Sequence, residues 1–171
     1  MAASLLAMVC GITRKSKKHE SNWAELDRHR EALLKLRDDL TALAGEDARA
    51  YDLLVEAMRR RKERKDEESE MQVLHALRHA TEVPHTTSKK CLEVLTAAER
   101  VAEIGSRNAY SDAGVAVLLA EAGLKGALMN VMINAETDKD PAYVAGMRAE
   151  VQALERRAAS SARSTLTKLD L

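Results

Sequence analysis

The stretch that decides the fold is SDAGVAVLLAEAGLKGALMNVMIN, residues 111–134. From Ala113 to Ile133 it is apolar on nearly every side, so a helix here should lie in the middle of a bundle. Ser111 and Asp112 favour an N-cap and predict where that helix starts. One stripe of small residues, spaced by three and four, ends in two amides and would let a helix or a flat ligand approach closely: Ala113, Ala116, Ala120, Gly123, Ala127, Asn130 and Asn134.

Amphipathic helices are predicted on both sides of this stretch, because apolar residues recur there at steps of three and four. Pro84 is suited to the first turn of a helix and Gly105 to its end, and Pro141 opens the last helix. The tail beyond Ala159 is expected to be frayed. The expected helices are 2–13, a long one from Ser21 or Asn22, 67–81, 84–105, 113–133 and one from 141.

Gly45 leaves the course of the long second helix open. If the helix continues, Asp47 falls on the apolar stripe that also carries Tyr51, Leu54 and Met58, where an unpaired carboxylate is costly to bury. If Gly45 ends the helix, Asp47 caps the next one. The charged run 59–68 is expected to be a solvated connection between helices.

Composition limits the class of protein. The 171 residues suit one domain with a sizeable core, and the absence of Phe with only two Pro and seven Gly favours an all-α antiparallel helical bundle. Equal numbers of acidic and basic residues give a formal charge of zero, which argues against a nucleic-acid partner. Two cysteines cannot form a disulfide framework, so a cytoplasmic location is expected.

The apolar opening, residues 2–12, indicates neither a signal peptide nor a membrane anchor. Its basic cluster follows the apolar run, whereas in a signal peptide it precedes it. The run is also too short to span a bilayer, so a buried helix is predicted and no membrane association is expected.

The chemistry-bearing residues do not form a phosphate-binding loop, a nucleophile elbow or a zinc motif. His75 and His79 share a helix face, but spacing alone favours a solvated pair over a metal site. Asn130 and Asn134 each need several hydrogen-bond partners in an apolar bundle. Either they bond to neighbouring helix ends or they face a ligand.

Several motifs together resemble the cyclodeaminase/cyclohydrolase family, which includes the cyclodeaminase half of formiminotransferase-cyclodeaminase and bacterial methenyltetrahydrofolate cyclohydrolases. The most specific part is Asn108–Val115, continued by Gly126-Ala127, Asn130-Val131 and Ile133-Asn134. Further matches are Met8–Cys10 with Ile12-Thr13, Lys17-Lys18, Asp47-Ala48 with Ala50–Asp52, and Thr81–Pro84.

The resemblance implies an enzyme that acts on the one-carbon bridge between N5 and N10 of tetrahydrofolate, as methenyltetrahydrofolate cyclohydrolase or formiminotetrahydrofolate cyclodeaminase. It implies a homodimer or larger assembly, and a folate substrate with no metal or redox cofactor. Asp112 is expected to be the general acid or base. The expected substrate-binding residues are Lys17 and Lys18 for the anionic glutamate tail, Asp47 and Tyr51 for one wall, Asn130 and Asn134 for the pterin or the bridge, and Asn108 and Ser111 beside Asp112.

One departure from the family pattern bears on activity. Family members carry a glycine-rich turn ahead of the first matched helix, whereas Met1–Ser4 already lie inside that helix. Residues 1–171 are therefore expected to form one helical domain that lacks the glycine-rich segment. The alternative to an enzyme is a truncated, non-catalytic helical assembly module of the same family.

Overall fold

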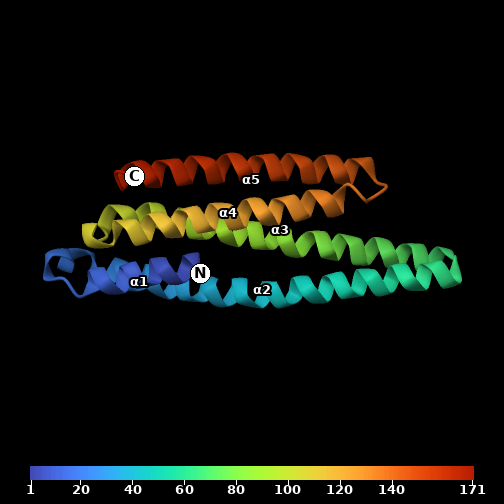
Figure 1. The fold of residues 1–171 in the computed structure, drawn as a ribbon, viewed down its shortest axis with the longest axis horizontal. Helices are drawn as coiled ribbons and strands as arrows, with labels where there is room; N and C mark the ends of the chain where they lie inside the picture. Colours follow the sequence, from blue (N-terminus) through green and yellow to red (C-terminus); the bar gives the residue numbers. More distant parts are fainter.

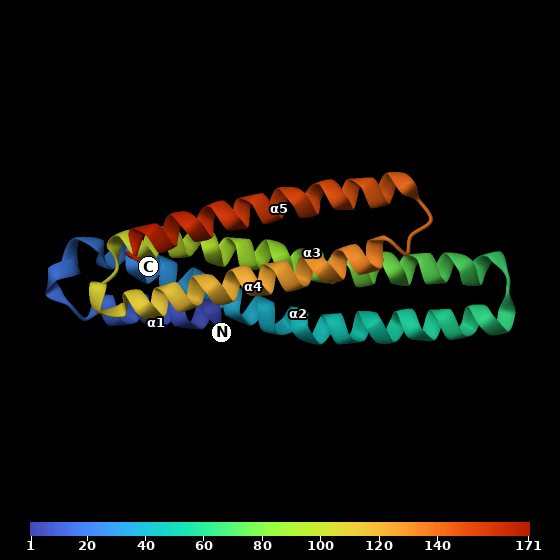
Figure 2. The ribbon, with the colours of Figure 1, turned by 45° about the horizontal axis from the view of Figure 1, so that its top comes forward.

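The computed structural model describes residues 1–171 as an antiparallel bundle of long helices without strands (Figure 1, Figure 2). This confirms the predicted fold class. The elements are α1 (Ala2–Arg14), the 3-10 helix η1 (Lys17–Asn22), α2 (Trp23–Arg64), α3 (Glu67–Ile104), the 3-10 helix η2 (Arg107–Ala109), α4 (Tyr110–Ala135) and α5 (Pro141–Lys168).

Two apolar cores hold the bundle together. The larger core joins all five α-helices, with Leu26, Leu95 and Leu124 completely buried. The smaller core lies between α2 and α3 alone and includes Leu54, Val73 and Leu77. The α2–α3 hairpin therefore extends beyond the other helices at one end of the molecule (Figure 1).

The helix α4 packs against α3, α5 and α1. Its residues Ala116, Val117, Ala120 and Val131 are almost fully buried. The prediction that this helix is enclosed on nearly every side is only partly met, because a fourth face of α4 stays exposed and carries large apolar side chains. Other helices thus cover α4 on three sides, and its fourth side is exposed to solvent.

Pro84 lies inside α3, and the prediction that it begins a helix is wrong. A proline within a helix has no N–H for the carbonyl four residues earlier, here that of Ala80. The Nδ2 of Asn134, on α4, donates to this carbonyl at 2.8 Å. The hydrogen bond that the helix loses is replaced from a neighbouring helix, so α3 continues from Glu67 to Ile104.

The helix α2 also continues where a break was one of two alternatives. It passes through Gly45 without interruption, so Asp47 is not an N-cap. The cost of one glycine, ~1 kcal/mol, is small beside the packing that α2 makes against α1 and α3. Asp47 lies on the exposed side of the helix, which removes the cost of a buried charge.

Two predicted helix ends are wrong as well. The helix α4 begins at Tyr110 with Ala109 as its N-cap, so Ser111 and Asp112 lie inside the first turn. The tail beyond Ala159 is helical to Lys168, not frayed. It is fixed because Ala162 and Thr165 are buried and because the ammonium of Lys168 binds Glu99 and Glu103.

One segment, Arg107–Ala135, is long and apolar enough to cross a membrane by length and composition. It is the helix α4 with the short turn before it. A single helix of this kind is weak evidence for a membrane span, because the core helix of a bundle has the same composition.

Candidate functional site

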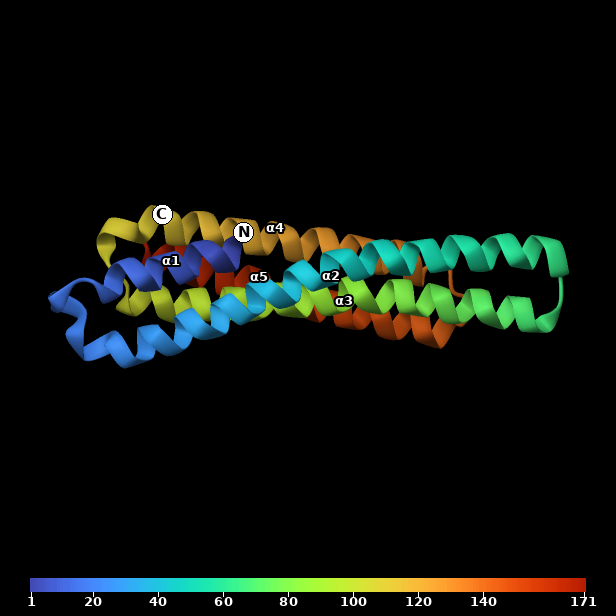
Figure 3. The ribbon, with the colours of Figure 1, turned by 90° about the horizontal axis from the view of Figure 1, so that it is seen from below.

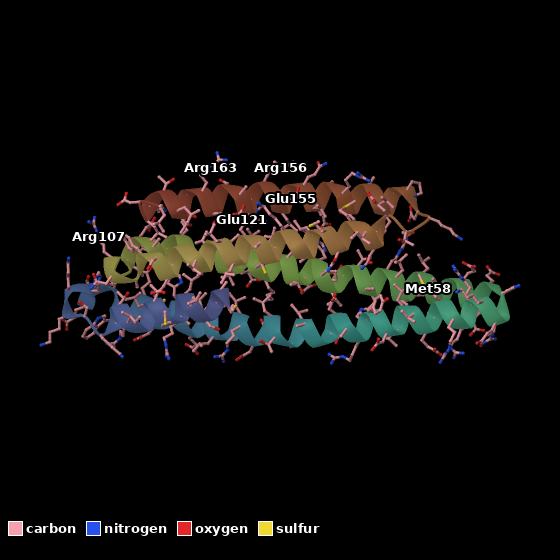
Figure 4. The ribbon with its side chains drawn as sticks, in the orientation of Figure 1. Met58, Arg107, Glu121, Glu155, Arg156 and Arg163 are labelled. Carbon is pink, nitrogen blue, oxygen red and sulfur yellow. The ribbon has the colours of Figure 1, made fainter.

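Five of the predicted site residues gather at one end of the bundle, the end that Arg107 marks in Figure 4. The backbone N–H of Ser106 donates to Oγ1 of Thr13 at 3.0 Å and ties the end of α1 to the turn before α4. This contact brings two segments far apart in the sequence to the same end of the bundle. The bundle-end group consists of Lys17 and Lys18 of η1, Asn108 of η2, and Ser111 and Asp112 of α4.

Asp112 is partly buried, whereas the other four residues of the bundle-end group are exposed. It lies in the first turn of α4, where the unpaired backbone N–H groups and the helix dipole favour a carboxylate. No side chain of the protein donates a hydrogen bond to it. Its oxygens are therefore free to accept a proton from water or from a ligand.

A basic groove of about 580 Å³ runs between α1 and α2 towards the bundle-end group. Its lining includes the cations of Arg14, Lys15, Arg30 and Arg37, and a single carboxylate, that of Asp27. Only Arg14 pairs with this carboxylate, at 3.0 Å. Arg37 is itself paired with Asp38 at 2.8 Å. Lys15 and Arg30 therefore leave the groove with an excess of positive charge next to Lys17 and Lys18.

The sequence analysis did not find Arg30 and Arg37 as candidate residues. They lie seven residues apart on α2 and therefore share one helix face. The seven-residue spacing can be read from the sequence, whereas the packing of α1 against this face of α2 cannot. An anionic group bound in this groove would meet side chains from both α1 and α2.

The other predicted residues lie near the middle of the bundle: Asp47 and Tyr51 on α2, and Asn130 and Asn134 on α4. Glu46 reaches His79 of α3 at 3.2 Å, while Asn134 reaches Ala80 of α3. The two walls of this mid-bundle group are therefore at the same level along α3. Asp47, Tyr51 and Asn130 are exposed, and Asn134 is partly buried.

Asn134 has a structural role because its amide nitrogen is bound to the Ala80 carbonyl. Of the two roles predicted for this amide, a hydrogen bond to a neighbouring helix and a contact with a ligand, the structure shows the first. The acceptor is not at a helix end but is an interior carbonyl that Pro84 leaves without a donor. Its Oδ1 is the acceptor that remains for a ligand. Asn130, one turn earlier, makes no hydrogen bond with the protein and keeps its whole amide available.

A charged network that the sequence analysis missed lies next to Asn134. The guanidinium of Arg78 donates to Asp138 at 2.8 Å and to Asp140 at 3.3 Å, and it stacks on the ring of Tyr143. The hydrogen bond from Arg78 holds the pKa of Asp138 below its usual value, while burial raises the pKa of Tyr143. This network joins α3 to the α4–α5 turn.

The same side of α3 opens into a pocket of about 580 Å³ that Arg78 and Asp138 line together with Met58 of α2, labelled in Figure 4. The sequence signal for this network was the acidic pair Asp138 and Asp140 before Pro141. Asp140 is explained fully as the N-cap of α5, since its side chain accepts from the N–H groups of Ala142 and Tyr143.

The two groups of predicted residues are far apart within one chain. Asp112 and Asn134 lie near opposite ends of α4, and their separation corresponds to ~33 Å of helix. A single reacting carbon atom cannot contact both. The predicted site residues of one chain therefore form two separate groups, called part-sites below, rather than one constellation.

A further groove of about 770 Å³, between α2, α3 and α5, contains none of the predicted residues. Its polar lining includes His29, Glu93, Arg100 and Glu150, and Glu150 also approaches the buried His85 at 2.9 Å. No group of three or more His, Cys, Asp or Glu side chains is arranged to hold a metal ion. His75 and His79 are both exposed.

Comparison with known proteins supports the predicted resemblance. The chain is 38% identical over 166 residues to a methenyltetrahydrofolate cyclohydrolase of Methylorubrum extorquens, which covers 92% of this chain and 80% of that protein. It is 28% identical over 172 residues to the formimidoyltransferase-cyclodeaminase of Sus scrofa, covering 99% of this chain but only 32% of that longer protein.

The fold is also similar to a solved structure. The crystal structure of formiminotetrahydrofolate cyclodeaminase from Thermotoga maritima matches 99% of this chain and 82% of its own, with a TM-score of 0.90 and 27% identity. The family model described as formiminotransferase-cyclodeaminase matches residues 1–153. Since that match spans most of the sequence and agrees with the motifs around Asp112 and Asn134, the chain belongs to the formiminotransferase-cyclodeaminase family.

Proposed function

We propose that this protein is a folate one-carbon enzyme that acts on the N5,N10 bridge of tetrahydrofolate. The observation that carries the proposal is the 38% identity, over 92% of the chain, to a methenyltetrahydrofolate cyclohydrolase. Hydrolysis of the methenyl bridge is therefore ranked ahead of cyclodeamination. Neither reaction changes an oxidation state, so the proposal needs no redox cofactor, and it invokes no metal.

In the proposed hydrolysis, water adds to the cationic methenyl carbon and forms a tetrahedral carbon between the two nitrogens. One proton of the water passes to a base, the bond from carbon to N5 breaks, and N5 takes a proton. The products are 10-formyltetrahydrofolate and one released proton. Asp112 is our candidate for this base, because its carboxylate is unpaired and partly shielded from solvent.

The substrate-binding roles follow the two groups of residues. Asn130 and the free oxygen of Asn134 would hold the pterin or the bridge through directional hydrogen bonds, with Asp47 and Tyr51 as the facing wall. Lys17 and Lys18 would bind the anionic glutamate tail, and the excess of cations in the groove between α1 and α2 supports an anionic ligand there. Asn108 and Ser111 would orient groups beside Asp112.

Each part-site holds one unpaired carboxylate, Asp112 or Asp47. Replacing each by asparagine in turn shows which carboxylate acts on the reacting carbon. The one that moves protons should lower kcat by a factor of ~100 to 10,000 when replaced. The other should change mainly KM, because it contributes binding alone.

Two assays test the proposed function directly. The first follows the loss of the methenyl chromophore of methenyltetrahydrofolate, and the second measures ammonia released from formiminotetrahydrofolate. Rates above the uncatalysed reaction in the first assay support the cyclohydrolase, and in the second the cyclodeaminase. If neither rate exceeds the background and calorimetry shows no folate binding, the non-catalytic assembly module is the better account.

We further propose that the protein works in the cytoplasm as a homodimer or larger assembly, without nucleic-acid or membrane partners. The neutral overall charge and the two free, buried cysteines support the location and the absence of nucleic acid. The exposed apolar face of α4 supports the assembly, since monomers rarely expose such a continuous strip. Sedimentation that gives only an 18.8 kDa monomer at micromolar concentration would contradict it.

A further inference from the structure

Thr13, the last residue but one of α1, is completely buried although its side chain carries a hydroxyl. Oγ1 donates to the Val9 carbonyl of its own helix at 2.8 Å and accepts from the backbone N–H of Ser106 at 3.0 Å. Thr165 of α5 is equally buried and donates in the same way to the Ser161 carbonyl, but no backbone N–H reaches its hydroxyl. The second hydrogen bond of Thr13 is therefore not a general consequence of burying a threonine in a helix.

Thr13 joins the N-caps of the two 3-10 helices at this end of the bundle. Its backbone carbonyl accepts from the N–H of Ser16 at 3.0 Å, and Ser16 is the N-cap of η1. Its hydroxyl binds the N–H of Ser106, which is the N-cap of η2. Lys17 directly follows the first serine, and Asp112 lies six residues after the second. One residue thus holds both segments that carry the bundle-end group.

The path from Ser106 to Asp112 has little freedom. Oγ of Ser106 accepts from the N–H of Asn108 at 3.4 Å, and its carbonyl accepts from the N–H of Ala109 at 3.0 Å. The helix η2 ends at Ala109 and α4 begins at the next residue, so no flexible linker separates the two. A change in the position of Ser106 is therefore carried into the first turn of α4, where Asp112 lies.

The Thr13 hydroxyl provides the only hydrogen bond or ion pair between α1 or η1 and the segment 105–112. Apolar packing adds to it, since Cγ1 of Val9 lies 3.7 Å from the position that a Cβ on Gly105 would occupy. Packing holds two surfaces together, whereas a hydrogen bond also fixes their relative orientation. In Figure 3 the end of α1 and the beginning of α4 lie side by side at the left end of the molecule.

We propose that Thr13 is a positioning residue for the bundle-end group, and that its hydroxyl fixes the distance between the cations of η1 and the carboxylate of Asp112. The catalytic consequence rests on the proposed function. Lys17 and Lys18 would bind the anionic tail of the substrate while Asp112 acts as the base, so their spacing sets where the reacting carbon lies relative to the carboxylate. A misplacement of about 1 Å can cost a factor on the order of 100 in rate.

Distance measurements between spin labels test the positioning without any need for activity. Lys18→Cys and Ser111→Cys, combined in one chain, place labels at exposed positions of η1 and of the first turn of α4. Native Cys10 and Cys91 stay unlabelled, since both are buried and burial raises the pKa of each thiol. The sample is diluted with unlabelled protein, so distances between copies do not contribute. We expect a narrow distance distribution that broadens with Thr13→Val, and an unchanged width would overturn the proposal.

Two control variants separate the hydrogen bond from general damage to the bundle. Thr165→Val is the same substitution at an equally buried threonine that accepts no backbone N–H, and it should leave the distribution narrow. Thr13→Ser keeps the hydroxyl and should also leave it narrow. Amide exchange at Ser106 should be about five- to tenfold faster in Thr13→Val alone. Equal broadening in all three variants would count against the proposal.

Steady-state kinetics in the methenyl assay test the catalytic consequence. Thr13→Val should lower kcat/KM about 10- to 100-fold, while Thr13→Ser and Thr165→Val stay within about threefold of wild type. A purely structural role would lower the Tm and leave kcat/KM of the folded protein unchanged, which would overturn the catalytic part. The loss should shrink when Lys17 and Lys18 are already glutamine, since Thr13 acts through them. If the wild type has no activity, the proposed function fails while the distance measurement still decides the positioning.

Discussion

Replacing Asn134 by alanine should destabilise the fold through a hydrogen bond made for Pro84. The Nδ2 of Asn134 is the donor for the Ala80 carbonyl, at 2.8 Å. Without it, a carbonyl in the buried middle of α3 has no partner. An unsatisfied buried acceptor costs about 1–3 kcal/mol of the free energy of unfolding. For a chain of this length that corresponds to a fall in Tm of ~2–12 °C.

A double-mutant cycle separates this cause from general damage to α4. In a Pro84→Ala background the backbone N–H of residue 84 becomes available to the Ala80 carbonyl. Replacement of Asn134 should then cost less than in the wild type, with an interaction free energy of about 1 kcal/mol or more. Both proteins compared in that background lack the proline ring, so the packing of the ring cancels.

The free energies come from urea unfolding of the four proteins, followed by far-ultraviolet circular dichroism. Asn130→Ala is the matched control: it removes the same amide one turn earlier, where it makes no hydrogen bond, and should change stability by less than about 0.5 kcal/mol. If the effects at positions 84 and 134 add within about 0.5 kcal/mol, the amide does not replace the missing N–H and our account of α3 is wrong.

Two further predictions concern the part-sites, and a third concerns the ion pair between Arg78 and Asp138. Asp112→Asn should lower kcat about 100- to 10,000-fold in the methenyl assay without changing the helical circular dichroism spectrum, and activity within about threefold of wild type would exclude a general acid or base there. Lys17→Gln with Lys18→Gln should raise KM more than it lowers kcat, and this effect should shrink at high salt, as titrations in salt would show. The pKa of Asp138 is depressed by Arg78, so the stability that this pair contributes is present above the ordinary pKa of about 4 and is lost as pH falls through the depressed pKa. Asp138→Asn should therefore flatten the acid limb of a plot of Tm against pH.

The helices that sequence analysis predicted well are those set by local rules. Three-and-four spacing of apolar residues identified α2 and α5, the apolar run 2–12 identified α1, and Gly105 ends α3 as expected. The prediction at Pro84 was wrong because the compensating donor, Asn134, comes from another helix far along the chain. A local rule for proline contains no information about such a partner.

The candidate site was harder to predict than the fold for a physical reason. Motifs identify residue types, whereas a site needs distances, and Asp112 and Asn134 belong to one continuous motif region although ~33 Å of helix separates them. The cations Arg30 and Arg37 were overlooked because their value depends on α1 lying against the same face of α2. The role of these two cations depends on packing between helices, whereas the separation of Asp112 and Asn134 depends on the length of α4.

The exposed strip on α4 also explains why the sequence predicted a helix enclosed on nearly every side. A helix that is apolar on all sides is expected to be buried when the protein functions. The partner that buries it can be another chain. Within one chain, α3, α5 and α1 cover three sides of α4, and Met129 and Ile133 remain in solvent on the fourth. In the homodimer or larger assembly that we propose, a second copy would cover that side. The apolar pattern of residues 111–134 would then describe the assembly rather than the single chain. Ala122→Glu, which places a charge on this exposed face, should convert the assembly to a monomer in sedimentation.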